Sequence, residues 1–250
     1  MLDIILKHRS IRKYKEESID NNLLNQILES GIRASNTGNM QTYSIIVSTQ
    51  KEIKERLWEV HFKQAMVMQA PIIITFCTDF NRFNKWCLQR NALPGYDNFL
   101  SFFNGAIDAL LVSQNVTLAA EANKLGICYL GTTTYNADKI IEILQLPRGV
   151  VPVTALVMGY PDETPGLTDR LPLNAVIHNE VYRDYTPEEI NEFYFEKENS
   201  DFTKELLKTN NKESLAQIFT DNRYRKSDNI LFSNKLLEVI EKQGFMNNQE

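Results

Sequence analysis

The stretch Ile72-Ile73-Ile74-Thr75-Phe76-Cys77 is a continuous run of β-branched, aromatic and apolar residues that follows Ala70-Pro71. A short run of this composition after a proline predicts a strand buried in the core. Three further runs predict strands at residues 43–48, 127–130 and 151–158. Because predicted helices separate these strands, we expect a mixed α/β core.

Helical periodicity marks the segments between the strands. Helices are predicted at residues 2–8, from the N-cap Asp20 to about Gly31, and at 51–68, 105–125 and 138–146. The helix at 105–125 has a broad apolar stripe, and Gly126 is its expected C-cap. From about Thr186 charged helices alternate with Asn-rich turns. We therefore predict a core at residues 1–185 and a helical C-terminal extension at 186–250.

Composition bounds the class of protein. The 250 residues carry a formal net charge of −5, with 43% hydrophobic and 24% charged residues, which is ordinary for a globular protein. This balance argues against a protein that coats nucleic acid, because such a protein carries a basic face. No apolar run reaches the roughly 18 residues that span a membrane, and Met1-Leu2-Asp3-Ile4 does not begin a secretory signal. We expect a cytoplasmic protein without nucleic-acid or membrane partners.

The cysteines and histidines are few and scattered. No CxxC pair occurs among Cys77, Cys87 and Cys128, so neither a disulfide framework nor a thiolate zinc site is expected. The three histidines show no HxH or HxxxH spacing. We therefore expect no metal site.

The run His8-Arg9-Ser10-Ile11-Arg12-Lys13-Tyr14 concentrates anion-binding groups near the N-terminus. Arginine forks hold phosphate oxygens through two N–H groups, and a hydroxyl adds a neutral donor. If several of these side chains converge, they hold a phosphate-bearing ligand. The other interpretation is a solvated basic turn after a short helix, where positive charge is favourable. The run by itself does not decide between the two.

The order of short motifs along the chain resembles that of the FMN-dependent nitroreductase and flavin reductase family. Within that family it is similar to the oxygen-insensitive branch, which has a long C-terminal extension and prefers NADPH. The resemblance covers roughly residues 1–182 and depends jointly on HRSIRKY at 8–14, the Ser/Asn/Gln loop at 35–41, Gln69-Ala70-Pro71, FCTDFNR at 76–82, LGICYLGTT at 125–133, LPRGVVPVTALVMGYP at 146–161 and DRLP at 169–172. The extension matches only in its helical character and in its ending near residues 242–245.

The resemblance implies an α+β fold, in which a mixed, mainly antiparallel central sheet is flanked by helices and followed by the helical extension. It also implies a homodimer with one FMN at each subunit interface. The helix at 105–125 would then serve the core and the dimer surface.

The same resemblance assigns roles to individual residues. It places His8, Arg9, Ser10 and Arg170 at the FMN phosphate, Arg12 near N1 of the reduced ring, Gln69 at the pyrimidine edge, and the backbone of Tyr129, Leu130, Gly131 and Thr132 against the ring near N5. A guanidinium stabilises the anionic reduced ring, and a glycine permits close approach of the backbone.

The loop residues Ser35, Asn36 and Asn39 belong to the implied cofactor set, although they can serve the ligand of the other subunit instead. Three assignments have simpler interpretations when the resemblance is set aside. Arg170 then fits a surface loop, Gln69 a helix cap and Gly131 an ordinary turn.

The implied activity is that of an NAD(P)H-dependent oxidoreductase. Hydride passes from NADPH or NADH to FMN, and a nitroaromatic, a quinone or free flavin then takes the electrons by a ping-pong scheme. The flavin performs the chemistry, so no catalytic triad or carboxylate pair is required. Arg223 and Arg225 are candidates for binding the 2′-phosphate of NADPH, and a solvated helix start is the other interpretation.

Three other functions stay open from the sequence. A flavoenzyme of the same fold can catalyse a different reaction, such as dehydrogenation or reductive dehalogenation. A flavin-binding module would hold FMN without turnover. An interaction scaffold with a degenerate pocket would not take up FMN, and the retained arginines argue against it.

One position departs from the family pattern. The branch commonly has a lysine two residues before the arginine of DRLP, and Thr168 stands there in this chain. One phosphate-binding charge is therefore missing. We expect either weaker FMN binding or compensation by protonated His8, which would make FMN affinity depend on pH in the imidazole range.

Overall fold

The computed structural model describes residues 2–248 of the chain. Its strands are β1 (Tyr43–Ser48), β2 (Ile72–Asp79), β3 (Gly126–Tyr129) and β4 (Val150–Gly159). They form one sheet in the order β1-β2-β4-β3, and every neighbouring pair is antiparallel. The expected α+β fold with an antiparallel central sheet is confirmed.

Most of the remaining chain is helical. The helices of the first two thirds are α1 (Leu2–Leu6), α2 (Asn21–Ile32), η1 (Thr37–Asn39), α3 (Lys51–Val60), α4 (Ala65–Gln69), α5 (Asn81–Gln89), α6 (Phe99–Ala122), η2 (Thr134–Asn136) and α7 (Ala137–Leu144). Those that follow are η3 (Leu173–Ala175), α8 (Pro187–Asn199), α9 (Asp201–Asn210), α10 (Leu215–Gln217), η4 (Ile218–Arg223) and α11 (Lys226–Lys242). Within residues 2–248, none of these helices combines the length and apolar character needed to cross a bilayer.

The chain groups into two compact units. Unit 1 extends to Gly166 and takes in the chain again from Phe232 onward, and unit 2 is Leu167–Leu231. The whole sheet belongs to unit 1. The division into a core at 1–185 and an extension at 186–250 stays a prediction, and most of α11 in that extension lies in unit 1.

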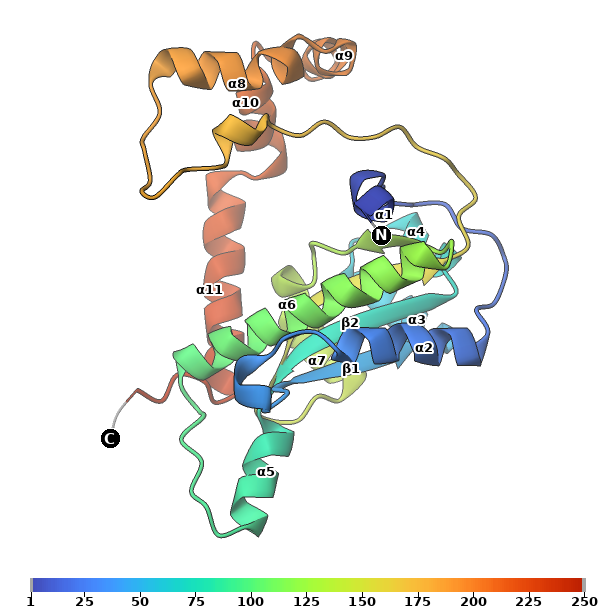
Figure 1. Ribbon diagram of the computed structural model, residues 1–250, viewed down its shortest axis with the longest axis vertical. Helices are drawn as coiled ribbons and strands as arrows, with labels where there is room; N and C mark the ends of the chain where they lie inside the picture. Colours follow the sequence, from blue (N-terminus) through green and yellow to red (C-terminus); the bar gives the residue numbers. More distant parts are fainter. Residues whose placement is uncertain (1, 249–250) are drawn as a thin grey trace. The chain divides into compact units, whose positions relative to one another are not determined.

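Helices cover both faces of the sheet in unit 1, and Figure 1 shows α2 and α6 side by side over one of them. On that face Ile74, Phe76 and Leu156 join a cluster with residues of α2 and α6. Alternate residues of the same strands, such as Ile73 and Val157, join a second cluster with α3, α4 and α7. Because successive strand residues point to opposite faces, double coverage explains why β2 is an uninterrupted apolar run.

The C-terminal end of the chain packs back into unit 1. Phe245 is 1% exposed and stacks edge-on against Phe80, with ring centroids 6.2 Å apart. Gln243 fixes this end through two hydrogen bonds, donating from Nε2 to the carbonyl of Val150 (3.0 Å) and accepting from the backbone N–H of Gly149 (3.0 Å). The end of the predicted extension is therefore part of the core.

The predicted helix at 51–68 is wrong, because the structure has two helices there. α3 ends at Val60 and α4 begins at Ala65. Between them Phe62 and Lys63 both adopt φ of 54°, a left-handed conformation that cannot continue a right-handed helix. Residues 51–68 contain no glycine or proline from which the break could have been predicted.

The predicted long helix at 105–125 also needs correction. α6 begins at Phe99 and ends at Ala122, with Asn123 as its C-cap. Gly126, the expected cap, is instead the first residue of β3. A Cβ built on Gly126 would lie 2.6 Å from Cγ1 of Ile11, so the glycine permits close packing between the N-terminal run and the sheet rather than a helix end.

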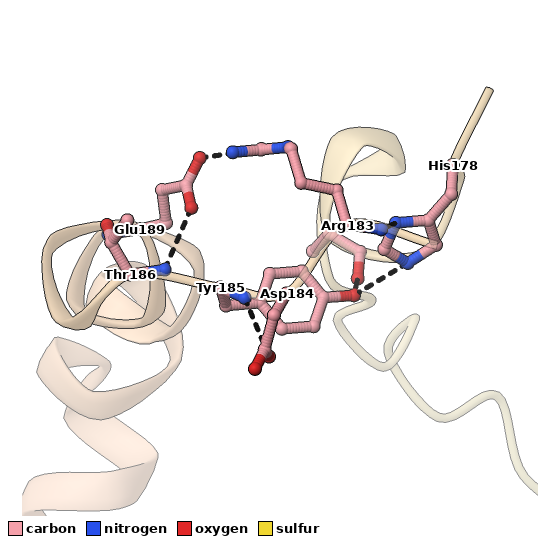
Figure 2. Close-up of polar contacts among 7 residues, drawn as sticks. His178, Arg183, Asp184, Tyr185, Thr186 and Glu189 are labelled. Atoms are coloured by element: carbon pink, nitrogen blue, oxygen red, sulfur yellow. Dashed lines mark hydrogen bonds and ion pairs between the residues drawn. The ribbon is translucent and has the colours of Figure 1, made fainter. Parts of the chain in front are cut away.

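Unit 2 contains a compact set of polar contacts just before α8, shown in Figure 2. The hydroxyl of Tyr185 donates to the carbonyl of Ala175 (2.7 Å) and lies 3.1 Å from Nε2 of His178. Nδ1 of His178 accepts from the backbone N–H of Arg183 (3.3 Å), whose guanidinium pairs with Glu189 (2.7 Å). These contacts fix how the chain enters α8.

Replacing Gly126 should destabilise the fold. We expect Gly126→Ala to lower the free energy of unfolding by about 1–3 kcal/mol, because the added methyl overlaps Ile11 in a packed core. Gly95→Ala is the matched control, since a Cβ at Gly95 meets nothing within 4 Å. Urea denaturation of both variants measures the difference, and equal midpoints would contradict this account of Gly126.

Candidate functional site

The N-terminal run lies along β3, at one edge of the sheet. Ser10 forms a parallel bridge with Ile127, and the N–H of Ile11 donates to the carbonyl of Ile127 (2.8 Å). The buried hydroxyl of Tyr14 closes the run by donating to the carbonyl of Ile11 (2.6 Å). The N-terminal run at 8–14 therefore lies beside β3, the strand that leads into the segment at 129–132. The structure thus brings together two segments that are more than a hundred residues apart in sequence.

His8 has a carboxylate partner that the sequence did not indicate. Its Nδ1 lies 2.6 Å from Oε1 of Glu121 on α6, and the side chains are 31% and 12% exposed. The other oxygen of Glu121, Oε2, is buried without a hydrogen-bond partner among the described residues. Glu121 fixes the orientation of the imidazole and leaves Nε2 as the nitrogen that can meet a ligand.

The two arginines of the run have different surroundings. Nε of Arg9 is buried and lacks a hydrogen-bond partner in the described chain, which is costly unless a ligand or water satisfies it. Arg12 is exposed, and its backbone N–H donates to Oε1 of Glu163 (2.5 Å). Within residues 2–248 the guanidinium of Arg12 makes no hydrogen bond or ion pair. Both guanidiniums therefore retain donors for an anion.

The segment after β3 is fixed on one side and open on the other. The hydroxyl of Tyr129 lies 3.0 Å from Oγ1 of Thr117 and 3.1 Å from Oγ of Ser113, both on α6, and the N–H of Leu130 donates to the carbonyl of Ala155 (2.8 Å). At Gly131, by contrast, a Cβ would meet no heavy atom within 4 Å. The backbone of Gly131 is thus accessible to a flat ligand.

Thr132 is held by a buried histidine. Nδ1 of His61 lies 2.8 Å from Oγ1 of Thr132, and the imidazole is 0% exposed. Burial lowers the pKa of His61 to about 4, so the ring is neutral at neutral pH. His61 is a residue that the sequence analysis missed, because a lone histidine within the predicted helix at 51–68 has no recognisable spacing to another functional residue.

These features fit a ligand with an anionic end and a planar ring. Arg9 offers a buried donor that has no partner among the described residues, and Gly131 leaves open space beside its backbone. FMN has a phosphate and a flat isoalloxazine, which match these two features. No group of three or more His, Cys, Asp or Glu residues within the described chain could hold a metal ion.

The predicted loop residues Ser35, Asn36 and Asn39 lie elsewhere in this chain. Their loop leads into β1, which is the sheet edge opposite β3. Three inter-strand spacings separate these edges, or about 14 Å. The structure therefore does not bring this loop beside the N-terminal run of the same chain.

A buried aspartate anchors that loop. Asp108 on α6 is 1% exposed and accepts hydrogen bonds from the N–H of Thr37 (2.9 Å) and the hydroxyl of Thr42 (2.9 Å). The sequence could have indicated that Asp108 is buried, since this aspartate interrupts an otherwise apolar helical stripe. The partner role of Glu121 had no comparable signal, because an exposed-looking glutamate near a helix end is ordinary.

A hollow of about 430 Å³ lies beside the same loop, within the size range of small-molecule sites. Its lining residues are Ile32, Met40, Gln41, Tyr43, Ser44, Ile45 and Arg82. Arg82 donates to the carbonyls of Gln41 and Tyr43 and so shapes one wall.

Gln69, another predicted cofactor residue, is exposed at the end of α4, and its side chain makes no hydrogen bond within residues 2–248.

The remaining predicted residues belong to unit 2. Arg170 is exposed, and its Nη1 donates to Oγ1 of Thr168 (2.7 Å) and to the carbonyl of Asp169 (2.9 Å). Thr168, which stands where a lysine was expected, thus accepts a hydrogen bond from Arg170. Arg223 lies over the ring of Phe219, and Arg225 pairs with Asp228 through two contacts of 2.8 and 3.2 Å.

Comparison with known proteins gives a consistent result. The nitroreductase family model matches residues 5–160. The chain is 31% identical over 246 residues to an FMN reductase (NAD(P)H) of Bacillus subtilis, covering 95% of this chain and 94% of that protein.

Two solved structures have the same fold. An oxidoreductase of Bacteroides fragilis is 50% identical, with a TM-score of 0.97 over 98% of this chain and 100% of that chain. The NfrA1 nitroreductase of Bacillus subtilis is 28% identical, with a TM-score of 0.88 over 99% of each chain.

Stability should depend on pH through His61. The folded pKa of about 4 lies below the ordinary value of 6.5, so between these values the unfolded chain binds more protons. The free energy of unfolding should therefore fall by about 3 kcal/mol as pH drops from 6.5 to 4. His61→Gln removes this contribution while retaining a polar side chain. Urea unfolding at several pH values tests this, and parallel pH profiles for the two proteins would contradict it.

Proposed function

The chain belongs to the nitroreductase family, and on this premise we propose that it is an FMN-dependent oxidoreductase that uses NAD(P)H as its electron donor. The observation that carries this proposal is the pairing of the N-terminal run with β3. That pairing places the unpartnered donor of Arg9 and the open backbone of Gly131 on segments flanking one strand. FMN supplies the redox chemistry when bound, and the protein supplies position and charge.

The proposed phosphate site in unit 1 consists of His8, Arg9 and Ser10. Arg9 is the strongest candidate, because binding a phosphate oxygen would satisfy its buried Nε. His8 is oriented for this task by Glu121. Ser10 adds a hydroxyl. Arg170, in unit 2, stays a predicted phosphate ligand, and its contacts with Thr168 and Asp169 engage only Nη1.

The proposed ring site consists of Arg12, Gln69 and the segment Tyr129, Leu130, Gly131 and Thr132. The guanidinium of Arg12, which makes no hydrogen bond or ion pair within residues 2–248, would stabilise negative charge on the pyrimidine side of the ring. Gln69 has an exposed amide that can donate and accept at the ring edge. The open side of Gly131 admits the ring against the backbone.

We propose that the active form is a homodimer. α6 exposes large apolar side chains at helical spacing, and these are Phe99, Phe103, Ile107, Leu110 and Leu111. A contiguous apolar helix face of this kind is typical of a protein–protein interface. In a homodimer the loop with Ser35, Asn36 and Asn39 is free to contact the FMN of the partner subunit, which accounts for its place at the opposite sheet edge.

NAD(P)H and the electron acceptor would use the site in turn, by a ping-pong scheme. Nitroaromatics, quinones and free flavin are the proposed acceptors. For NADPH, Arg223 is a better candidate for the 2′-phosphate than Arg225, because Asp228 already pairs with Nε and Nη2 of Arg225. Cytoplasmic location stays a prediction.

An anaerobic half-reaction tests the function. Purified protein loaded with FMN should lose its visible flavin absorption when mixed with NADPH or NADH, and should regain it when a quinone or nitrofuran is added. Comparing the two nucleotides measures the donor preference. A bound flavin that neither nucleotide bleaches would overturn the proposal in favour of a non-turnover FMN-binding module.

Gly131→Ala separates cofactor approach from folding. The unoccupied protein should keep its unfolding midpoint, because the new Cβ meets nothing within 4 Å. FMN affinity should fall by about tenfold or more, because the methyl enters space reserved for the ring. Gly95→Ala, which also meets no neighbour, serves as the control for the glycine-to-alanine change itself. Fluorescence titration with FMN gives both affinities, and an unchanged Kd would place the ring away from Gly131.

A further inference from the structure

The turn that follows Gly131 has few hydrogen bonds of its own. The N–H of Thr133 donates to the carbonyl of Leu130 (3.1 Å), and the N–H of Tyr135 donates to the carbonyl of Thr132 (3.2 Å). Beyond Asn136 the chain enters α7. Such a short irregular segment takes its position from the elements packed around it.

Asn136 is the residue where two of these elements meet. It is 7% exposed, and its Nδ2 donates to the carbonyl of Val60 at the end of α3 (2.6 Å). Its Oδ1 accepts from Nζ of Lys235 on α11 (3.2 Å). Both ends of the amide are therefore used, so α3 and α11 are linked through the turn.

Helix α11 makes two more contacts with the same segment. Nζ of Lys235 also lies 2.9 Å from Oδ1 of Asp138. One helical turn earlier, the ring of Phe232 stacks on Tyr135, with centroids 4.2 Å apart and planes 9° from parallel. All of these residues belong to unit 1. α11 thus contacts residues 135, 136 and 138 from one side, while His61 holds Thr132 from α3.

We propose that Lys235 is a positioning residue for the flavin, through which the C-terminal helix α11 sets the place of the backbone at Gly131–Thr132. This inference rests on the proposed function, because it assumes that the turn faces FMN. Lys235 touches neither the cofactor nor a substrate in this proposal. Its ammonium binds both Asn136 and Asp138, and Gly131 lies only five positions before Asn136 in the sequence.

Lys235→Met tests the proposal, because it removes the ammonium and keeps the apolar stem. We expect the Kd for FMN to rise about three- to tenfold, in the range of single contacts that act through a neighbour. The visible absorption band of bound FMN should shift as well, because the ring meets a displaced backbone. Lys235→Arg should restore much of both properties, since it keeps the positive charge.

Lys242→Met is the matched control on the same helix. Lys242 is exposed and forms no ion pair or hydrogen bond within the described chain, so this variant should behave as the wild-type protein. The unfolding midpoint of each variant is measured alongside. If Lys235→Met lowers the midpoint but leaves the FMN Kd and spectrum unchanged, the role of Lys235 is structural only and the proposal fails.

Two results keep this test separate from the proposed function. Failure of the wild-type protein to bind FMN would overturn the proposed function itself. Normal FMN binding by the wild type together with an unaltered Lys235→Met would overturn only the role of α11. If Lys235→Met does not fold, Asp138→Asn weakens the same ion pair while preserving the bond to Asn136, and it should raise the Kd in the same direction. An unchanged Kd in that variant would count against the proposal.

Discussion

Burial of β2 and β4 on both faces is the constraint on which the rest of the structure depends. These two strands occupy the centre of the sheet, with α2 and α6 on one face and α3, α4 and α7 on the other. A position inside such a layer has no room for a polar ligand. Chemistry is therefore confined to the two outer strands and to the segments beside them.

Different polar groups lie beside the two edges of the sheet. Beside β3 lie the N-terminal run and the open backbone of Gly131, with Glu121 orienting His8. Before β1 lies a loop that Asp108 ties to α6 through Thr37 and Thr42. In the proposed homodimer these two sets complement each other across the interface, so each half-site is incomplete in a single chain.

The C-terminal extension is more than an appendage of the core. Phe245 and Gln243 are buried in unit 1, and α11 contacts the turn after β3 through Phe232 and Lys235. Residues late in the sequence thereby reach the segment proposed to face the flavin. A change in this part of α11 is expected to alter cofactor properties as well as stability.

The sequence by itself determined the four strands, the N-cap of α2 by Asp20 and the family, because continuous apolar runs, capping residues and short motifs are local properties of the chain. It did not reveal the break at Phe62 and Lys63, since left-handed residues other than glycine leave no compositional mark. Only the tertiary structure paired His8 with Glu121, His61 with Thr132 and Lys235 with Asn136. Such partners are distant in sequence, and each is selected by which faces of the helices and strands pack together.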